Sequence, residues 1–298
     1  MKNIITIIIR LTLSCILAGA VMGTTYIFTS NAKKHNEHVN EQKVMYGLLG
    51  YNKDKPAPET TVMHEVYRYV VTEGEALTLG YLVPLQEHGF SFITIDLDGK
   101  FLASTPVEVS HELVIDGTER NKIIAATLGT EKSLRYADKT IIVTDNGKRQ
   151  AYLLPGAFPG FKTFISVMLA LDPSFTILGL EVMEHEEDPG LGGEIIQDYF
   201  KNQFKGKPFE VLNKLDVVKT PIPADYLKAL EAKKSGMSKA DVAAIQEQYK
   251  DKDIYALTGA TISSRAVTSG AKGIVKKFAY RISILDNVLQ EQQIAVPF

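Results

Sequence analysis

The pattern of hydrophobic and polar residues begins with a long apolar segment at the N-terminus. Residues 11–32 contain no charged side chain, and this run is long enough to cross the roughly 30 Å hydrocarbon core of a bilayer as one helix. A cleaved signal peptide is the competing interpretation, because Lys2 precedes the apolar run. The run exceeds the about 7–15 residues of a signal-peptide core, and no small-x-small cleavage site follows at the right distance. We therefore expect an uncleaved, single-pass membrane anchor.

The region after the anchor is polar at first and then rich in strand signals. Residues 32–55 read as a polar stalk, which ends at a Pro-rich break over residues 55–58. Runs of β-branched and aromatic residues between turn signals then predict strands. These runs cover residues 65–71, 76–83, 90–97, 139–144, 164–171 and 175–183.

Two of the strand-and-turn segments resemble each other. Residues 81–84 (Tyr-Leu-Val-Pro) are followed by Gly89-Phe90, and residues 152–155 (Tyr-Leu-Leu-Pro) are followed by Gly160-Phe161. Both segments have four residues between the Pro and the Gly. The likeness indicates either a duplicated hairpin unit or a chance similarity of two strand–turn–strand segments, and the sequence leaves both open.

A long amphipathic helix is predicted near the C-terminus, from about Ser263 to about Asp286. Its apolar residues recur at steps of three and four, which places them on one core-facing side. They are Val267, Ala271, Ile274, Phe278 and Ile282. Before this helix, small residues around Gly259 tighten the backbone. Unpaired N–H groups and the helix dipole favour a phosphate at such a helix start, although the same residues also suit an ordinary N-capping turn.

Composition and charge narrow the possible chemistry. The 298 residues carry a net charge of −2, which gives no support for a nucleic-acid partner. Because Cys15 is the single cysteine, one chain can form no intramolecular disulfide, four-thiolate zinc site or cysteine-ligated iron–sulfur cluster. His35 and His38 are closely spaced in a polar stretch where we expect solvation, and we predict no metal site. An electron-transfer function would therefore need an organic cofactor.

The run from Thr258 to Ser264 resembles the Ser/Thr-Gly-Ala-Thr-x-Ser/Thr motif of a known family. This family is the FMN-binding domain of the G subunit of Rnf complexes and of the C subunit of the sodium-pumping NADH:quinone reductase. The residues that follow the motif look more like the Rnf branch. The resemblance implies that the hydroxyl of Thr261 is esterified to the FMN phosphate. It also implies a phosphate cradle formed by Thr258, Gly259, Ala260, Ser263 and Ser264.

A second run, from His185 to Ile195, is similar to the family's H-x-E-x-P-G-L-G-x-x-I motif. Its Pro-Gly and Gly-Gly pairs predict a tight, exposed loop followed by a helix. The resemblance places this loop beside the flavin. It implies cofactor contacts from His185, Gly190, Leu191 and Gly192. A purely structural role for His185 remains the alternative.

One departure from the family pattern lies near this site. The family commonly has Asp three residues before the first Ser/Thr of the motif, and Tyr255 occupies that position here. Asp253 lies two residues earlier. If attachment of the flavin needs that carboxylate, Asp253 would have to supply it.

The expected fold is α+β, with an N-terminal transmembrane helix followed by an extracytoplasmic FMN-binding domain of antiparallel β-strands with packed helices. We expect a cytoplasmic N-terminus and membrane anchor over residues 1–34 and a stalk with a strand-rich extension over residues 35–150. The FMN-binding domain is expected over residues 151–285 and a tail over residues 286–298. Charges on the two sides of the anchor nearly balance, so the expected location rests on the resemblance. It implies a single-pass protein of the cytoplasmic (inner) membrane with its C-terminal domain on the extracytoplasmic, periplasmic side.

The resemblance implies a membrane-bound electron-transfer subunit that carries covalent FMN in an ion-translocating ferredoxin:NAD oxidoreductase (Rnf) complex. Such a chain would be a redox subunit of an enzyme and not a complete enzyme alone. No residue is expected to act as a general acid or base. The implied partners are other Rnf-type membrane subunits, a flavin-attaching transferase during maturation, and membrane lipid. The alternatives are the C subunit of the sodium-translocating NADH:quinone reductase and a non-catalytic, membrane-anchored assembly or sensory module.

Overall fold

The computed structural model describes the backbone of residues 2–129 and 131–298. It also describes their side chains, except those of residues 2, 3, 31, 32, 34, 35, 37 and 38. The pair His35 and His38, which we predicted to be solvated, therefore lies outside the described side chains. The chain divides into two compact units, which meet in sequence between Met45 and Tyr46.

Helix α1 (Lys2–Leu48) contains the predicted membrane anchor. Its segment Ile4–Ser30 is long and apolar enough to cross a bilayer, and its large side chains are exposed, as Phe28 is at 74%. Hydroxyl groups in this segment bond to a carbonyl three or four residues earlier, as that of Thr12 does at 2.9 Å. These hydroxyls would therefore keep a hydrogen-bond partner within the helix when the helix is surrounded by the hydrocarbon of a bilayer. The helix continues into the predicted stalk and ends at Leu48, because residues 32–46 contain neither Pro nor Gly.

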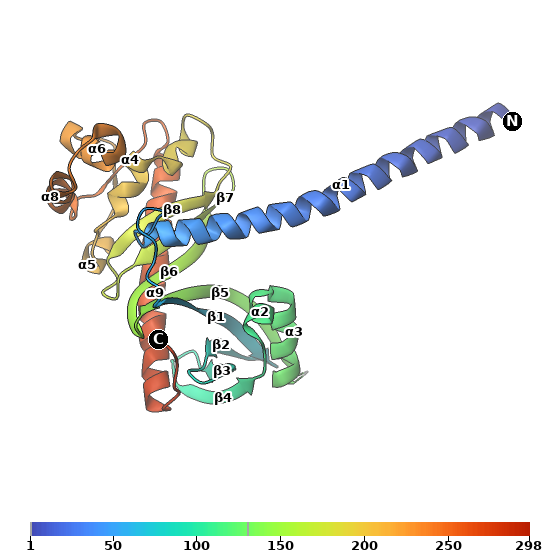
Figure 1. The fold of residues 1–298 in the computed structure, drawn as a ribbon, viewed down its shortest axis with the longest axis horizontal. Helices are drawn as coiled ribbons and strands as arrows, with labels where there is room; N and C mark the ends of the chain where they lie inside the picture. The colour runs from blue at the N-terminus through green and yellow to red at the C-terminus, as the bar shows by residue number, and fades with distance from the viewer. Residues whose placement is uncertain (1, 130) are drawn as a thin grey trace. The chain divides into compact units, whose positions relative to one another are not determined.

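The second unit is built on one eight-stranded sheet (Figure 1). In chain order the strands are β1 (Thr61–Glu73), β2 (Ala76–Pro84), β3 (Phe90–Ile95), β4 (Phe101–Val107), β5 (Lys132–Asp145), β6 (Lys148–Pro159), β7 (Phe164–Leu171) and β8 (Ile177–Glu184). Their order in the sheet is β4-β3-β2-β1-β5-β6-β7-β8. All neighbours are antiparallel. The predicted α+β class with an antiparallel sheet is confirmed.

The sheet is continuous across the position where we predicted a domain boundary, between residues 150 and 151. Strand β6 runs through that position and pairs with β5 on one side and with β7 on the other. The region expected as a strand-rich extension supplies β1 to β5. The extension and the segment that carries the predicted cofactor motifs therefore share one sheet.

Each half of the sheet is a four-stranded meander, β1–β4 or β5–β8, and the halves join through the β1–β5 pair. The two similar segments found in the sequence fall in the second strand of each half. Tyr81 in β2 and Tyr152 in β6 are both buried. The hairpins differ, because Pro84 pairs with Phe90 at the end of β2 whereas β6 continues beyond Pro155. This correspondence of strands favours a duplicated unit over a chance likeness.

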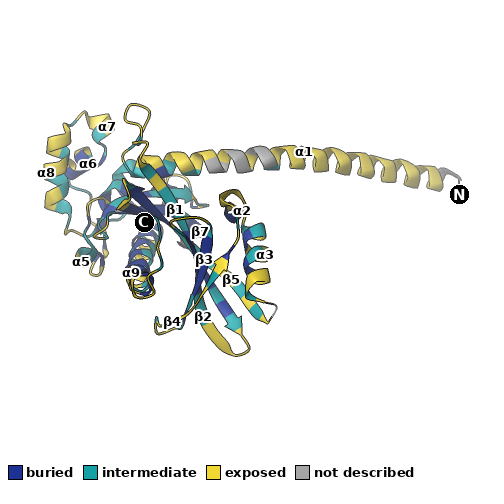
Figure 2. Ribbon diagram, turned by 60° about the horizontal axis from the view of Figure 1, so that its bottom comes forward, coloured by how far each residue is buried: buried dark blue, intermediate teal, exposed yellow. Residues whose placement is uncertain are grey.

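Helices pack on both faces of the first half of the sheet. Helices α2 (His111–Ile115) and α3 (Gly117–Leu128) cover one face, whose core cluster includes Leu82 and Ile124. Helix α9 (Thr261–Glu291) packs in the cluster that contains Tyr81. Successive residues of a strand point to opposite faces of the sheet, so the neighbouring residues Tyr81 and Leu82 of β2 belong to different clusters. Figure 2 shows that much of the sheet is buried, in dark blue.

Helix α9 is the predicted C-terminal helix, although it begins at Thr261 and ends at Glu291. Four of the five predicted core residues are buried, and Ile274 is partly buried. The helix continues beyond the expected end at residue 286 because Val288 and Leu289 are also buried. The predicted tail therefore begins inside α9. After the helix, the chain is tied to the β2–β3 turn by a 3.0 Å hydrogen bond from the N–H of Gln86 to the carbonyl of Ala295.

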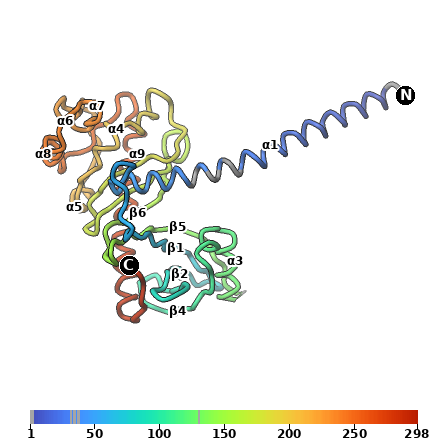
Figure 3. Tube along the Cα trace, viewed as in Figure 1, coloured from blue at the N-terminus to red at the C-terminus, as the bar shows by residue number. Residues whose placement is uncertain are grey.

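Short elements connect β8 to α9, and Figure 3 follows this part of the trace back to the start of α9. They are η1 (Gly192–Ile196), α4 (Asp198–Lys201), η2 (Asn202–Phe204), α5 (Phe209–Leu212), β9 (Val217–Val218), α6 (Ala224–Leu230), α7 (Ala232–Ser235), α8 (Lys239–Tyr249) and β10 (Ile254–Tyr255). The helix predicted after the acidic loop is thus three short helical segments, η1, α4 and η2. Strands β9 and β10 form a separate parallel pair.

Gly270 and Gly273 give a matched test of how closely α9 packs on the sheet. A Cβ at Gly270 would lie 2.1 Å from a ring carbon of Phe158 in β6, whereas nothing lies within 4 Å of a Cβ at Gly273. Alanine is favoured over glycine in a helix interior by about 1 kcal/mol. We expect Gly273→Ala to stabilise the fold by about 0.5–1 kcal/mol, and Gly270→Ala to destabilise it by about 1–3 kcal/mol through overpacking. Urea unfolding in detergent would measure both, and shifts of the same sign would contradict the packing.

Candidate functional site

The predicted phosphate site lies at the first turn of α9. Ala260 precedes the helix, and no described side chain caps the helix start. Gly259 has a φ of 75°, a conformation that residues with a Cβ rarely adopt. The hydroxyl of Ser264 accepts a hydrogen bond from the N–H of Leu257 at 3.0 Å and donates to the carbonyl of Ala260 at 2.9 Å, which closes the turn. Without a side-chain cap, the first N–H groups of α9 and the helix dipole favour an anion at this end.

Exposure separates the residues of the predicted cradle into two groups. Thr258 and Gly259 are exposed, and Thr261 is partly exposed. The buried members are Ala260, Ser263 and Ser264. The hydroxyls of both serines are engaged inside the protein, so their observed contacts build the turn. Thr261 is the hydroxyl in the first turn of α9 that a ligand can reach.

The acidic loop after β8 folds back on itself. The N–H groups of Leu191 and Gly193 both donate to the carbonyl of Asp188, at 3.1 and 2.8 Å. His185 is partly buried, and its Nδ1 accepts a hydrogen bond from the N–H of Glu187 at 3.2 Å. This contact lies within the loop and is typical of a structural histidine. Contacts of His185 and of the exposed Gly190 with a cofactor stay predictions.

Leu191 and Gly192 bring the two predicted motifs together. Leu191 is 46% exposed, and a Cβ at Gly259 would lie 3.1 Å from its Cδ2 atom. Gly192 is buried, and a Cβ there would lie 2.5 Å from the hydroxyl oxygen of Ser263. The acidic loop and the start of α9 are therefore in direct contact, although about 70 residues separate them in the sequence.

A buried carboxylate, that of Glu187, joins the same segments. Its Oε1 accepts hydrogen bonds from the N–H groups of Phe161 and Lys162, at 2.7 and 3.2 Å, and its Oε2 accepts one from the hydroxyl of Ser263. Glu187 is 4% exposed. We did not predict it as a site residue, although it stands at the glutamate position of the second motif. The donors come from the β6–β7 loop and from α9, and local sequence carries no signal for such contacts.

Two glycines leave the space that this carboxylate fills. A Cβ at Gly160 would lie 2.5 Å from Oε1 of Glu187, and a Cβ at Gly192 would lie 2.6 Å from Oε2. Real Cβ atoms do not approach other atoms so closely, so a side chain at either position would displace the carboxylate. The glycine of the acidic loop is therefore required by the packing around Glu187.

Exposed apolar side chains lie on the segments that meet at the start of α9. Phe161 is 58% exposed, Leu191 46% and Ile262 60%. An ion pair of 2.5 Å between Lys162 and Asp188 links two of these segments, with both side chains about half exposed. A flavin mononucleotide needs an apolar surface for its ring system and N–H donors for its phosphate. The exposed apolar side chains supply such a surface, and the first N–H groups of α9 supply the donors.

The residues just before the motif belong to an aromatic cluster. The ring of Tyr255 packs edge-on against Tyr226 with centroids 6.1 Å apart, and Tyr226 stacks on Tyr249 at 4.0 Å. Burial raises the pKa of Tyr255. Asp253 accepts a hydrogen bond from the N–H of Asp216 at 2.9 Å. Tyr255 therefore has a packing role in this chain, and the nearby carboxylate is engaged at the start of β9.

Lys207 anchors the same region from inside. It is 1% exposed, and its Nζ donates to the carbonyls of Tyr249, Lys250 and Lys252 at 3.3, 3.1 and 2.5 Å. The last carbonyls of a helix lack partners within the helix, so this lysine satisfies groups at the end of α8. Burial lowers the pKa of Lys207 to about 8. The surrounding lysines and glycine give no sign in the sequence that this one is buried.

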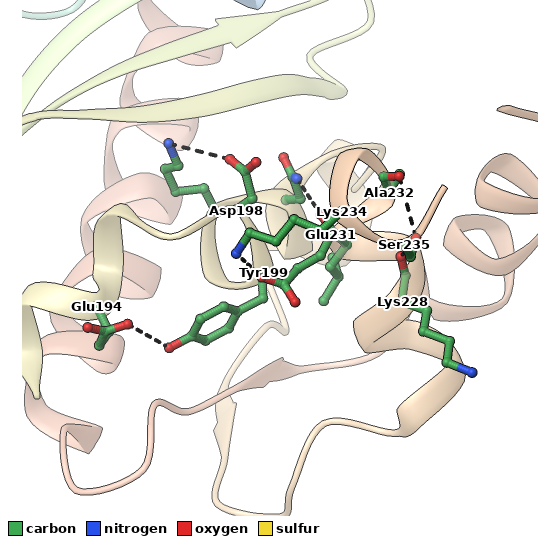
Figure 4. A network of polar contacts seen from close by, with 11 residues as sticks. Glu194, Asp198, Tyr199, Lys228, Glu231, Ala232, Lys234 and Ser235 are labelled. Atoms are coloured by element: carbon green, nitrogen blue, oxygen red, sulfur yellow. Dashed lines mark hydrogen bonds and ion pairs between the residues drawn. The ribbon is translucent and has the colours of Figure 1, made fainter. Parts of the chain in front are cut away.

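A polar network fixes the helices that follow the acidic loop (Figure 4). The hydroxyl of Tyr199 in α4 donates to Glu194 in η1 at 3.2 Å. Lys234 in α7 donates to Glu231 at 2.6 Å. The side-chain amide of Asn202 in η2 donates to the carbonyl at the end of α6 at 2.7 Å. These contacts hold the short helices in place beyond the loop.

Among the described residues, no group of three or more His, Cys, Asp or Glu could hold a metal ion.

Comparison with known families agrees with this arrangement. Residues 160–276 match the family described as FMN-binding domain. This segment of the chain is therefore similar to FMN-binding domains. The matched range contains the β6–β7 loop, the acidic loop and the start of α9, and it supports FMN as the ligand of this site.

The curated relatives of this chain are subunits of oxidoreductase complexes. It is 28% identical over 130 residues to the G subunit of the proton-translocating ferredoxin:NAD(+) oxidoreductase complex of Clostridium ljungdahlii, covering 44% of this chain and 54% of the relative. It is 39% identical over 59 residues to the G subunit of the ion-translocating oxidoreductase complex of Pasteurella multocida, covering 20% and 29%. The match thus spans about half the length of the first relative. The relatives and the apolar helix together support a membrane-anchored protein.

A solved structure is also similar to part of this chain. It is the crystal structure of the C subunit of the Na(+)-translocating NADH-quinone reductase from Parabacteroides distasonis, at 20% sequence identity and a TM-score of 0.33. The similarity covers 58% of this chain and 70% of that chain.

Proposed function

We propose that this chain is a membrane-bound electron-transfer subunit that carries FMN, bound covalently through Thr261, in an ion-translocating ferredoxin:NAD oxidoreductase complex. The observation that carries the proposal is the placement of Thr261. Thr261 is a partly exposed residue in the first turn of α9, which no side chain caps, inside the segment that matches the FMN-binding domain family. The G-subunit relatives support the choice of complex.

The chain's own residues hold and orient the cofactor. Thr261 supplies the oxygen of the phosphoester, and the N–H groups of the first turn of α9 stabilise the phosphate charge. Leu191 and Ile262 offer apolar surface that keeps water from one side of a flat ring. When bound, FMN supplies the ability to accept and release one electron at a time. No residue of the site needs to act as a general acid or base.

The proposed setting is the cytoplasmic membrane, with α1 as a single-pass anchor and the FMN-binding domain on the extracytoplasmic side. Free FMN is scarce outside the cytoplasm, and a covalent bond would prevent its loss there. The proposed partners are the other membrane subunits, lipid around α1, and a transferase that attaches the flavin during maturation. The contacts of Thr258, Gly190 and His185 with FMN are part of this proposal.

Mass spectrometry of the protein purified from its own host under denaturing conditions tests the proposal. We expect the mass of one FMN less one water on the peptide that contains Thr261, with flavin fluorescence that survives denaturation. Expression in a host without the flavin-attaching transferase is the control and should give an unmodified chain. An unmodified Thr261 in cells that contain the transferase would contradict the proposal and favour a non-catalytic assembly module.

The electron acceptor distinguishes the proposed complex from the sodium-translocating NADH:quinone reductase. A purified complex of the proposed kind would reduce NAD with ferredoxin as the electron donor. Reduction of quinone by NADH, without any dependence on ferredoxin, would instead identify this chain as the corresponding subunit of the quinone reductase.

A further inference from the structure

Ser263 is the link between the carboxylate of Glu187 and the attachment residue. It lies two positions after Thr261 in the first turn of α9, and its hydroxyl donates to Glu187. A helix start is prone to fray because its first N–H groups have no partners within the helix. The contact to a buried group therefore fixes the rotation of this turn, and with it the direction in which the Thr261 hydroxyl points.

The same carboxylate fixes the loop that faces this turn. Two successive N–H groups, those of Phe161 and Lys162, point at one of its oxygens, an arrangement that binds anions. Glu187 already accepts hydrogen bonds from these two N–H groups and from the hydroxyl of Ser263. A phosphate therefore cannot bind to these three donors. The first N–H groups of α9, beside Thr261, have no partner within the helix and can bind a phosphate.

We infer that Glu187 is a positioning residue for flavin attachment, which acts through Ser263 to present the hydroxyl of Thr261. The inference rests on the proposed function. In the attachment step, the oxygen of Thr261 bonds to phosphorus as its hydroxyl gives up a proton. The transferase supplies the flavin as a phosphoanhydride of a second nucleotide, and that nucleotide leaves with the electron pair of the broken P–O bond and takes the proton. No group is oxidised or reduced, and Glu187 touches none of the reacting atoms.

The test measures the rate of attachment in the full-length chain in detergent, with a fixed amount of the transferase and its flavin dinucleotide substrate. Flavin fluorescence of denatured samples, followed over time, gives the rate, and peptide mass locates the adduct. We expect Glu187→Ala to slow attachment by about ten- to hundred-fold, the scale of losses that follow misplacement of a reacting group by about 1 Å. Ser263→Ala should slow it by a similar or smaller factor.

The double variant distinguishes a shared pathway from two separate defects. If Ser263 acts through Glu187, combining Glu187→Ala with Ser263→Ala should give the rate of Glu187→Ala alone, because the second change removes nothing further. Glu187→Gln should recover part of the rate, because its amide oxygen can still accept from the N–H groups of Phe161 and Lys162. Effects that multiply would overturn the proposed pathway through Ser263.

Two controls separate positioning from loss of stability. Glu186→Ala removes the neighbouring exposed carboxylate and should leave the rate unchanged. Ile124→Ala destabilises the core cluster under α3, on the other face of the sheet, and should lower the thermal midpoint without slowing attachment. If Ile124→Ala slows attachment as much as Glu187→Ala does, the effect of Glu187 is general stability and the inference is wrong.

The failure of this inference differs from the failure of the proposed function. A wild-type chain that takes up no flavin would contradict the proposed function itself. A wild-type chain that is labelled on Thr261, together with a Glu187→Ala chain labelled at the same rate, would overturn only the positioning role. If Glu187→Ala does not fold, Ser263→Ala and Glu187→Gln carry the test, and wild-type rates in both would overturn the inference.

Discussion

Thr261→Ala is expected to lose covalent FMN completely, because the substitution removes the one reachable hydroxyl of the first turn of α9. The other two hydroxyls in that turn, those of Ser263 and Ser264, are buried and engaged. Thr258 is exposed but precedes the helix and its N–H donors. Flavin fluorescence after denaturation should fall to background, and the intact mass should equal that of the unmodified chain.

Two variants control for indirect effects of this change. Thr258→Ala should retain one FMN per chain, because Thr258 contributes surface beside the phosphate and not the ester oxygen. Thr261→Ser keeps a hydroxyl at the same place and should retain attachment, more slowly, because serine has greater χ1 freedom in a helix. A Thr261→Ala chain that still carries flavin, with the adduct on Thr258, would contradict the proposal that attachment requires the hydroxyl in the first turn of α9.

The start of α9 could be predicted from the sequence because its signals are local. Gly259, the small residues around it and the regular apolar spacing that follows lie within one continuous run, and the buried stripe appears as expected. The end of the helix was predicted too early. Val288 and Leu289 continue the same spacing, and their burial extends the helix through the residues that we expected to form a tail.

The single sheet could not be predicted, because it depends on pairing between distant segments. β1 pairs with β5 across the two helices that separate them in the sequence, and β5 pairs with β6 across the expected domain boundary. Local strand patterns identify candidate strands but do not specify their neighbours. The sequence therefore predicts a strand-rich extension apart from the FMN-binding domain, whereas the strands on both sides of residue 150 form one sheet.

Within the candidate site, the sequence predicts which residues lie at the site better than it predicts what each of them contacts. Ser263 and Ser264 were predicted to shape a phosphate cradle, but their hydroxyls contact Glu187 and the backbone of the turn, and cofactor contacts from them stay predictions. The sequence predicts a tight, exposed loop around Glu187, so the burial of its carboxylate was not predicted. Its burial arises from donors in two distant segments, and only the folded chain brings them together.

Arg120→Ala is expected to destabilise the fold by about 3–5 kcal/mol, because Arg120 is buried and makes several contacts at once. It is 6% exposed and lies with its guanidinium 3.8 Å from the ring centre of Tyr67. It donates to the hydroxyl of Tyr69 at 2.7 Å and to the carbonyl of Val114 at 2.6 Å. Alanine would leave both acceptors without this donor and open a cavity under α3. Urea unfolding of the full-length chain in detergent would measure the loss.

Arg135→Ala is the matched control, because Arg135 is an exposed arginine in β5 and its removal should change the stability by less than about 0.5 kcal/mol. Arg120→Lys should lie between the two, since it keeps the charge but cannot make the same forked contacts. Flavin attachment to Thr261 should persist in all three variants at temperatures where they remain folded. The cluster around Arg120 occupies the face of the sheet opposite α9, so it contributes to the stability of the scaffold and not to the geometry of the site. A loss below about 1 kcal/mol in Arg120→Ala would contradict the assigned contacts.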